Sequence, residues 1–175
     1  MDGLVRSLEK RFRMYKELGD KAFAQVPEDR LAVPGPGGGN SLAVLCWHVA
    51  GNLRSRFTDF LTTDGEKPWR DREEEFATRQ VTRAELQAKW NEGWEVLFAT
   101  LGTLSDADLG RTVKIRDEAM GAHDAFLRAL GHLSYHVGQI VYIAHSIVGD
   151  EWKYLSIAPG QSKAFNATMM GAPKG

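Results

Sequence analysis

The sequence has one cysteine, no long apolar run and no excess of charge of either sign, and each absence removes a class of protein. Cys46 has no second cysteine with which to form an internal disulfide, which fits a reducing compartment. No apolar run approaches the roughly 20 residues that cross a bilayer, and residues 1–18 mix charges where a signal peptide would be apolar. We therefore expect a cytoplasmic protein that does not associate with membranes.

The charges are balanced along the chain, with 22 lysines and arginines, 23 aspartates and glutamates, and a formal net charge of -1. Such a distribution offers no basic footprint, so we expect neither DNA nor RNA as a partner. The chain also lacks a Cys-x-x-Cys pair and a glycine-rich phosphate loop after a strand. Its 175 residues suffice for one hydrophobic core but not comfortably for two, which predicts a single domain over residues 1–175.

Apolar residues recur at intervals of three and four in four segments, a spacing typical of amphipathic helices. Asn40 or Ser41 can cap the second helix, and Thr82 with Glu85 matches a capping box before the third. Four helices separated by long loops favour an all-α fold, a four-helix bundle. The predicted helices cover residues 3–26, 41–61, 82–101 and 121–148.

Three segments outside these helices carry weaker signals. Residues 66–80 are polar and read as a long connection with a short helical turn, and the charge run at residues 73–75 is interpreted as solvated surface. Residues 112–116 alternate in polarity and allow a short extended piece. The C-terminal tail, residues 151–175, has spaced apolar side chains, so we expect it to pack back on the bundle.

The histidines predict a metal site. His132 and His136 are four residues apart, about 40° on a helical wheel and one turn along the axis, so they can share one ion. His123 and His145 lie half a turn round the helix from this pair and face elsewhere. His48 stands beside the apolar stripe of the second helix, and three ligands are the usual set at a catalytic zinc-type site. We predict a divalent ion at His48, His132 and His136, with hydrogen-bonded edge histidines as the alternative.

Two amides lie near the predicted ligands. Gln139 follows His136 by three residues and Asn52 follows His48 by one turn, so each can hydrogen-bond to a ligating imidazole or weakly bind the ion. An ordinary interhelical hydrogen bond is the alternative for both. Cys46 lies about 200° from His48 around the helix and is predicted to be a small buried residue.

The segments LCWHVAGN (residues 45–52) and HLSYHVGQI (residues 132–140) also carry a family resemblance. Through them the chain resembles the DinB-like superfamily of four-helix-bundle metalloproteins over nearly its whole length. The resemblance implies a metal site at His48, His132 and His136, commonly filled by zinc or nickel, in a bundle that often forms a homodimer. Better-studied members are transferases and isomerases that use bacillithiol or mycothiol, which implies a low-molecular-weight thiol as cofactor.

Several functions remain open. The leading hypothesis is a metal-dependent enzyme of the thiol S-transferase type that acts on a small-molecule substrate. A metal-dependent hydrolase is less favoured, because no aspartate or glutamate stands out as its general base. The alternatives are a non-catalytic metal-stabilised module for stress response or dimerisation, and a metal-free bundle. The sequence alone identifies no catalytic residue.

Overall fold

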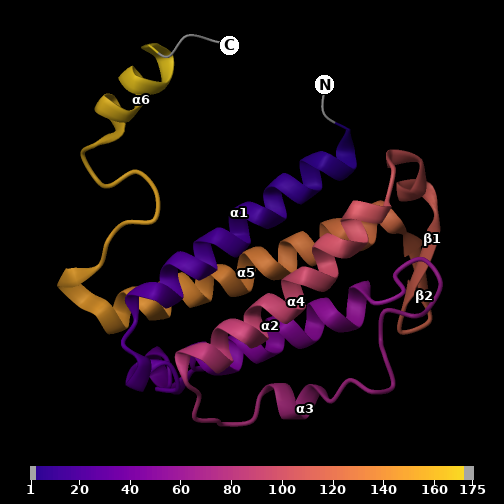
Figure 1. Ribbon diagram of the computed structural model, residues 1–175, viewed down its shortest axis with the longest axis horizontal. Helices are drawn as coiled ribbons and strands as arrows, with labels where there is room; N and C mark the ends of the chain where they lie inside the picture. Colours follow the sequence, from indigo (N-terminus) through magenta and orange to yellow (C-terminus); the bar gives the residue numbers. More distant parts are fainter. Residues whose placement is uncertain (1–2, 172–175) are drawn as a thin grey trace.

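The structure is a computed structural model that describes residues 3–171, and four long helices form most of it (Figure 1). Helix α1 packs along α5 and helix α2 along α4, while contacts of α2 with α5 and of α1 with α4 join the pairs into one bundle. The predicted all-α bundle is thus confirmed. Within the described residues, no helix combines the length and apolarity that crossing a membrane requires. The four helices are α1 (Leu4–Gln25), α2 (Leu42–Phe57), α4 (Arg83–Thr103) and α5 (Ala122–Val148).

Shorter elements connect the helices. The predicted helical turn in the long connection is present, and the extended piece belongs to a two-stranded antiparallel hairpin whose strands β1 and β2 pair Thr112 with Gly121 and Ile115 with Glu118. The hairpin lies at one end of the bundle, directly before α5 (Figure 1). The elements are η1 (Glu28–Arg30), η2 (Pro36–Gly38), α3 (Arg72–Glu75), η3 (Asp106–Gly110), β1 (Thr112–Ile115), β2 (Glu118–Gly121) and η4 (Gly149–Glu151).

Two of the helices begin at the predicted caps. The Ser41 hydroxyl accepts a hydrogen bond from the Val44 amide at 3.2 Å, so Ser41 rather than Asn40 caps α2. At α4, the Thr82 hydroxyl accepts from the Glu85 amide at 3.2 Å and the Glu85 carboxylate accepts from the Thr82 amide at 2.8 Å. This reciprocal pair is the predicted capping box.

The interface between α2 and α4 is close-packed and apolar. A Cβ on Gly93 of α4 would lie 2.6 Å from the Ala50 Cα of α2, so the absence of a side chain at Gly93 is what allows the two backbones to approach. Trp90 and Trp94 are fully buried beside this contact. Cys46 is buried as well, and its thiol donates to the Leu86 carbonyl at 3.4 Å, as expected for a small core residue.

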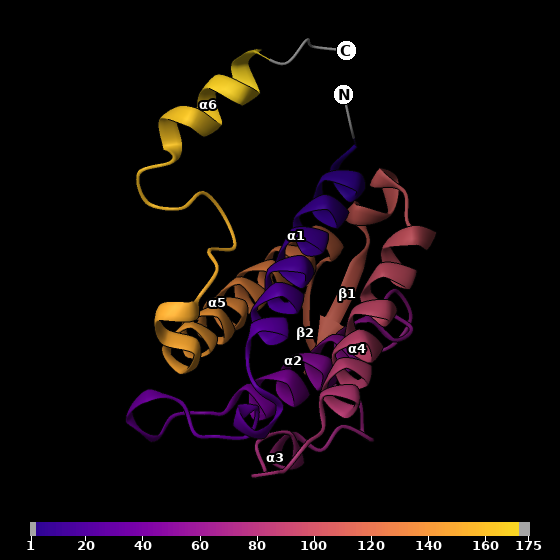
Figure 2. The same cartoon turned by 60° about the vertical axis from the view of Figure 1, so that its left-hand side comes forward.

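The prediction that the C-terminal tail packs on the bundle holds only for its first part. Trp152 and Leu155 pack against the core. Helix α6 (Ser162–Gly171), by contrast, has no buried residue, and both views show it standing away from the four helices (Figures 1 and 2). The prediction is therefore wrong for Phe165 and Met169, which are exposed. Their spacing of four residues gives the helix an apolar face but does not bring that face to the bundle.

Candidate metal centre

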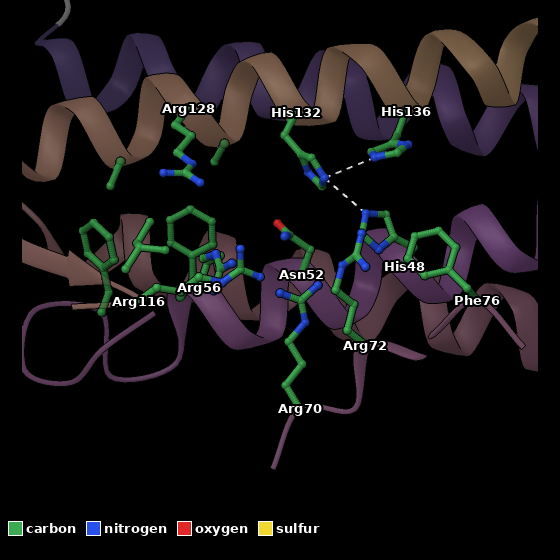
Figure 3. A pocket seen from close by; sticks show the side chains of 15 residues that line it. His48, Asn52, Arg56, Arg70, Arg72, Phe76, Arg116, Arg128, His132 and His136 are labelled. Carbon is green, nitrogen blue, oxygen red and sulfur yellow. Dashed lines mark hydrogen bonds between the residues drawn. The ribbon is translucent and has the colours of Figure 1, made fainter. Parts of the chain in front are cut away.

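The imidazoles of His48, His132 and His136 meet between α2 and α5 (Figure 3). The Nε2 atom of His132 lies 3.2 Å from Nε2 of His48 and 3.1 Å from Nε2 of His136. The three rings stand at 71°, 74° and 77° to one another. Histidine nitrogens around a tetrahedral zinc ion, at about 2.0–2.1 Å from the metal, are roughly 3.3 Å apart. Two of the three distances therefore match those around one ion, and all three ligand atoms lie within 4.8 Å of one another.

The other two histidines lie apart from this cluster, as predicted. His123 uses Nδ1 to donate to the Leu109 carbonyl at 3.1 Å. His145 stacks on Trp152, with ring centroids 5.1 Å apart and an interplanar angle of 21°. The helical wheel correctly separated His123 and His145 from His132 and His136. It could do so because all four histidines lie in one continuous helix, α5.

Glu75 of α3 holds the ring of His48. Its Oε2 accepts from His48 Nδ1 at 2.9 Å, and Arg70 donates to both carboxylate oxygens, at 2.7 and 2.9 Å. Burial alone would raise the pKa of Glu75, but the hydrogen bonds from His48 and Arg70 lower it below its usual value. The carboxylate is therefore ionised, so His48 donates to it from Nδ1 and turns its Nε2 atom toward His132.

Glu75 corrects the interpretation of residues 73–75 as solvated surface, which is wrong at this position because Glu75 is buried. Gly51 of α2 makes the burial possible, since a Cβ there would lie 2.6 Å from the Glu75 carboxyl carbon. The missed signal is Phe76, an apolar residue directly after the charge run, whose ring lies 4.6 Å from that of His48. An apolar residue in a polar connection indicates that the connection folds back onto the bundle.

Gln139 holds the ring of His136, and Asn52 lies farther along α2. The Gln139 Oε1 atom accepts from His136 Nδ1 at 2.8 Å, and its Nε2 donates to the Tyr135 hydroxyl at 3.2 Å. Asn52 lines the adjoining pocket, one turn beyond His48. Of the two amides singled out from the sequence, Gln139 therefore contacts a histidine of the cluster directly.

The donor set of the cluster fits a cation. Because His48 and His136 both carry their proton on Nδ1, their Nε2 lone pairs converge, and one N–H from His132 can satisfy at most one of them well. His132 Nδ1, in turn, is a buried atom without a hydrogen-bond partner in residues 3–171. Burial, then the charges that His136 and His48 would carry, lower the pKa of His132 to about 3, and burial also lowers that of His136. Neutral imidazoles with converging lone pairs are metal ligands.

A pocket of about 280 Å³ opens beside the cluster, and all three histidines line it (Figure 3). No aspartate or glutamate of the described chain is among its lining residues, whereas five arginines are. These arginines were not predicted, although Arg128 precedes His132 by one turn and Arg56 follows His48 by two, which places them on the same helix faces. The five are Arg56, Arg70, Arg72, Arg116 and Arg128.

Fold and site together define a four-helix-bundle protein with a cluster of three histidines that could hold a metal ion. The chain belongs to the family described as "Protein of unknown function (DUF1572)", whose model matches residues 2–161. No curated protein and no solved structure matches the chain. The matched segment contains the four bundle helices and the three clustered histidines, and it ends before α6.

Proposed function

We propose that the protein is a metal-dependent enzyme of the thiol S-transferase type and a relative of the DinB-like superfamily. The observation that supports this most strongly is the convergence of three imidazole Nε2 atoms on one point at the wall of a pocket. Structural metal sites are usually closed by four protein ligands, whereas catalytic sites keep a position for water or substrate. A set of three histidines beside a pocket is of the second kind.

His48, His132 and His136 would hold the ion, and zinc or nickel suits their neutral imidazoles. When bound, such an ion lowers the pKa of a thiol that coordinates to it, so that the thiol reacts as thiolate. Glu75 and Gln139 fix the tautomers and orientations of two of the three rings. Partners of this kind also raise the basicity of the ligands, which strengthens metal binding.

The lining of the pocket favours a thiol over water as the nucleophile. A hydrolase of this type needs a carboxylate or similar base beside the attacking water, and no carboxylate lines the pocket within residues 3–171. The Glu75 carboxylate, which lies behind His48, is occupied by hydrogen bonds from His48 and Arg70. A thiol is more acidic than water and reacts without such a base.

The thiol itself must come from a small molecule. Cys46, the one cysteine of the chain, is fully buried, and burial raises the pKa of its thiol far above the usual value. In the transfer, the sulfur of the small thiol forms a bond to an electrophilic carbon of the substrate. The leaving group departs with the electron pair of its bond, and the thiol proton passes to solvent. We place this reaction in the cytoplasm, where small thiols are kept reduced.

Metal content measured on protein without a histidine tag tests the site. Inductively coupled plasma mass spectrometry should find close to one zinc or nickel ion per chain in the wild type. In His132→Ala the affinity for the metal should fall at least about 100-fold, because only two of the three histidine ligands remain. His145→Ala is the matched control, since it removes a histidine of the same helix that stacks on Trp152 instead. Equal metal content in the two variants would contradict the site.

Turnover tests the reaction. The metal-loaded protein is incubated with electrophiles such as a halodinitrobenzene or an epoxide, with and without bacillithiol, mycothiol or glutathione. Metal-dependent product with one of these thiols supports the transferase. Product formation without any thiol points to hydrolysis instead. If metal raises the melting temperature but no substrate is turned over, the ion only stabilises the fold. That result would overturn the enzymatic proposal.

A further inference from the structure

The pocket beside the histidines has walls of strongly positive character. Arg128 projects into it from α5, whereas Arg56 of α2, Arg70 of the connection and Arg72 of α3 come from the side opposite α5 (Figure 3). Arg116, from the turn of the β1–β2 hairpin, closes the far end. Five guanidinium groups around about 280 Å³ are far more than packing requires, because arginine is seldom placed in a pocket without an anionic counterpart.

Two carboxylates lie behind these arginines, and they neutralise only part of the charge. Glu66 pairs with Arg56 at 3.1 Å and with Arg116 at 2.9 Å, and its other oxygen is 3.7 Å from Arg70. Glu75 is bound by Arg70 and by His48. Two negative charges are thus shared among three arginines, which leaves this part of the wall with an excess of positive charge.

The two remaining arginines are only loosely paired. Arg128 lies 3.9 Å from Glu118, and Arg72 lies 3.9 Å from Glu73. Both glutamates are well exposed, at 73% and 92% of their side-chain surface, so these contacts hold the guanidinium groups weakly. The donors of Arg72 and Arg128 are therefore ready to bind another anion.

The spacing of these residues along the helices sets a length. His48, Asn52 and Arg56 follow one another at intervals of four on α2, and Arg128 and His132 do the same on α5. With a rise of 1.5 Å per residue, the Cα atom of Arg128 lies about 6 Å along α5 from that of His132, and the Cα atom of Arg56 lies about 12 Å along α2 from that of His48. A small anion bound at Arg56 would not reach the histidines, whereas a longer ligand could contact both.

From this arrangement we propose that the pocket binds an elongated organic acid, whose carboxylate or phosphate lies on Arg128 and its neighbouring arginines while its other end reaches the histidine cluster. This inference rests on the proposed function in one respect: the end of the acid that lies at the histidine cluster is taken to carry the reacting group. Ala129 lines the pocket between Arg128 and His132 on α5, and Phe57 and Phe60, which follow Arg56, add apolar surface at the arginine end. Arginine suits such an acid because its planar fork of donors matches both carboxylate and phosphate oxygens.

Calorimetric titration of the untagged, EDTA-treated protein tests the acid site without any metal. The probes are hexanoate, hexyl phosphate and, as the neutral analogue, hexanamide. We expect one of the two acids to bind at least 10-fold more tightly than hexanamide, and which acid binds better identifies the acid group. In Arg128→Gln, this binding should weaken about 10- to 100-fold, as expected for the loss of a charge-assisted hydrogen bond.

Arg111→Gln is the matched control. The Arg111 side chain is exposed to the same extent as that of Arg128, 52%, and it also has a loose acidic partner, Asp108, but it does not line the pocket. Binding of both acids no tighter than that of hexanamide, or equal loss in the two variants, would overturn the inference. Because these titrations use metal-free protein, their outcome is separate from whether thiol transfer is observed.

The length requirement has its own test in zinc-loaded protein. Dicarboxylates of increasing chain length, from succinate through adipate to suberate, offer one carboxylate to each end of the pocket. Affinity should rise by at least 10-fold from succinate to a longer member, and Arg128→Gln should abolish that rise while Arg111→Gln preserves it. An affinity that does not depend on chain length would contradict a ligand spanning from Arg128 to the histidines.

Discussion

Helix α2 meets α4 on one side and α5 on the other, and the two interfaces differ in packing and in chemistry. Toward α4 the contact is close along the helix, with Gly93 against Ala50 and buried tryptophans beside it. Toward α5 the contacts are sparse, and the space between the helices holds His48 and its two partner histidines, with the pocket beside them. Helix α2 thus packs tightly against α4 with one face and lines the pocket with polar groups on the other.

The difference shows how a small bundle can contain a polar site and remain stable. Removing three imidazoles and the guanidinium groups of Arg56 and Arg70 from water is costly, because each loses hydration. The apolar interface of α2 with α4 offsets that cost by close packing, which requires residues without bulk, such as Gly93. Changes on the α4 side should therefore affect stability, whereas changes on the α5 side should affect ligand binding.

The largest effect is expected for Gly93→Ala. The new methyl group would meet the backbone of Ala50, so α2 and α4 must separate, at a cost of about 2–3 kcal/mol. The melting temperature should fall by roughly 5–10 °C for a chain of this size. Gly102→Ala on the same helix is the control, because a Cβ there meets nothing within 4 Å. Similar melting temperatures for the two variants would show that the contact does not limit packing.

Gly51→Ala should weaken metal binding and leave the fold intact. The methyl group displaces the Glu75 carboxylate from His48, and loss of such a partner typically lowers metal affinity about 10- to 100-fold. Competition with a chromophoric chelator measures the affinity. Glu75→Gln should give a similar loss, and the double variant little more, since both changes break one contact. Gly138→Ala of α5, where a Cβ has free space, should bind as the wild type does.

Asp64→Asn should loosen the end of the pocket formed by the hairpin. Asp64 accepts hydrogen bonds from the amides of Glu66, Arg116 and Asp117 at 2.7, 2.9 and 2.8 Å, which lower its pKa to about 2. Since the folded pKa lies below the unfolded value of about 3.9, the stabilisation is complete above that value and disappears as the pH falls to about 2.

Urea unfolding at two pH values checks this expectation. At pH 7 the Asp64→Asn variant should be less stable than the wild type by about 1 kcal/mol, given that the site is partly exposed. At pH 2 the difference should fall to a small fraction of its value at pH 7, because the wild-type carboxyl is then about half protonated in the folded state and almost fully protonated in the unfolded state. A difference that stays constant between these pH values would assign the effect to shape rather than to charge.

The smallest effect on stability is expected from truncation after Gln161. Helix α6 has no buried residue, so its removal should change the melting temperature by no more than about 1–2 °C. We propose, from the superfamily resemblance, that the protein is a homodimer, and the exposed Phe165, Met169 and Met170 make α6 a candidate contact. Light scattering of both forms tests this: a monomeric full-length protein contradicts the dimer, and a dimeric truncated form excludes α6 as its contact.

The sequence predicted most of the bundle because its signals there are local. Apolar periodicity located all four helices, and the caps at Ser41 and Thr82 marked two of their beginnings correctly. The grouping of His132 with His136 follows from helix geometry alone. Bringing His48 to them required only that α2 and α5 face each other.

The groups that sequence reasoning missed all depend on contacts distant in the chain. Glu75 reaches His48 because the connection that carries the short helix α3 folds over α2 at Gly51. The charge of the pocket depends on which carboxylates pair with which arginines. The spacing of residues along the sequence does not predict these pairs. The misplaced tail has the same cause, since the periodicity of α6 defines an apolar face and says nothing of what covers it.

Because Arg56, Arg128 and the three histidines lie on the same two helices at intervals of four residues, loop movement cannot change the backbone distance between these arginines and the histidines. If the pocket binds an acid in this way, a related chain would take a longer or shorter acid by carrying an arginine four residues away along the helix, a step of about 6 Å. Ligand length among such proteins should therefore change in steps. The position of the arginine, at residue 124 or 128 on α5 and at residue 52 or 56 on α2, would set that length.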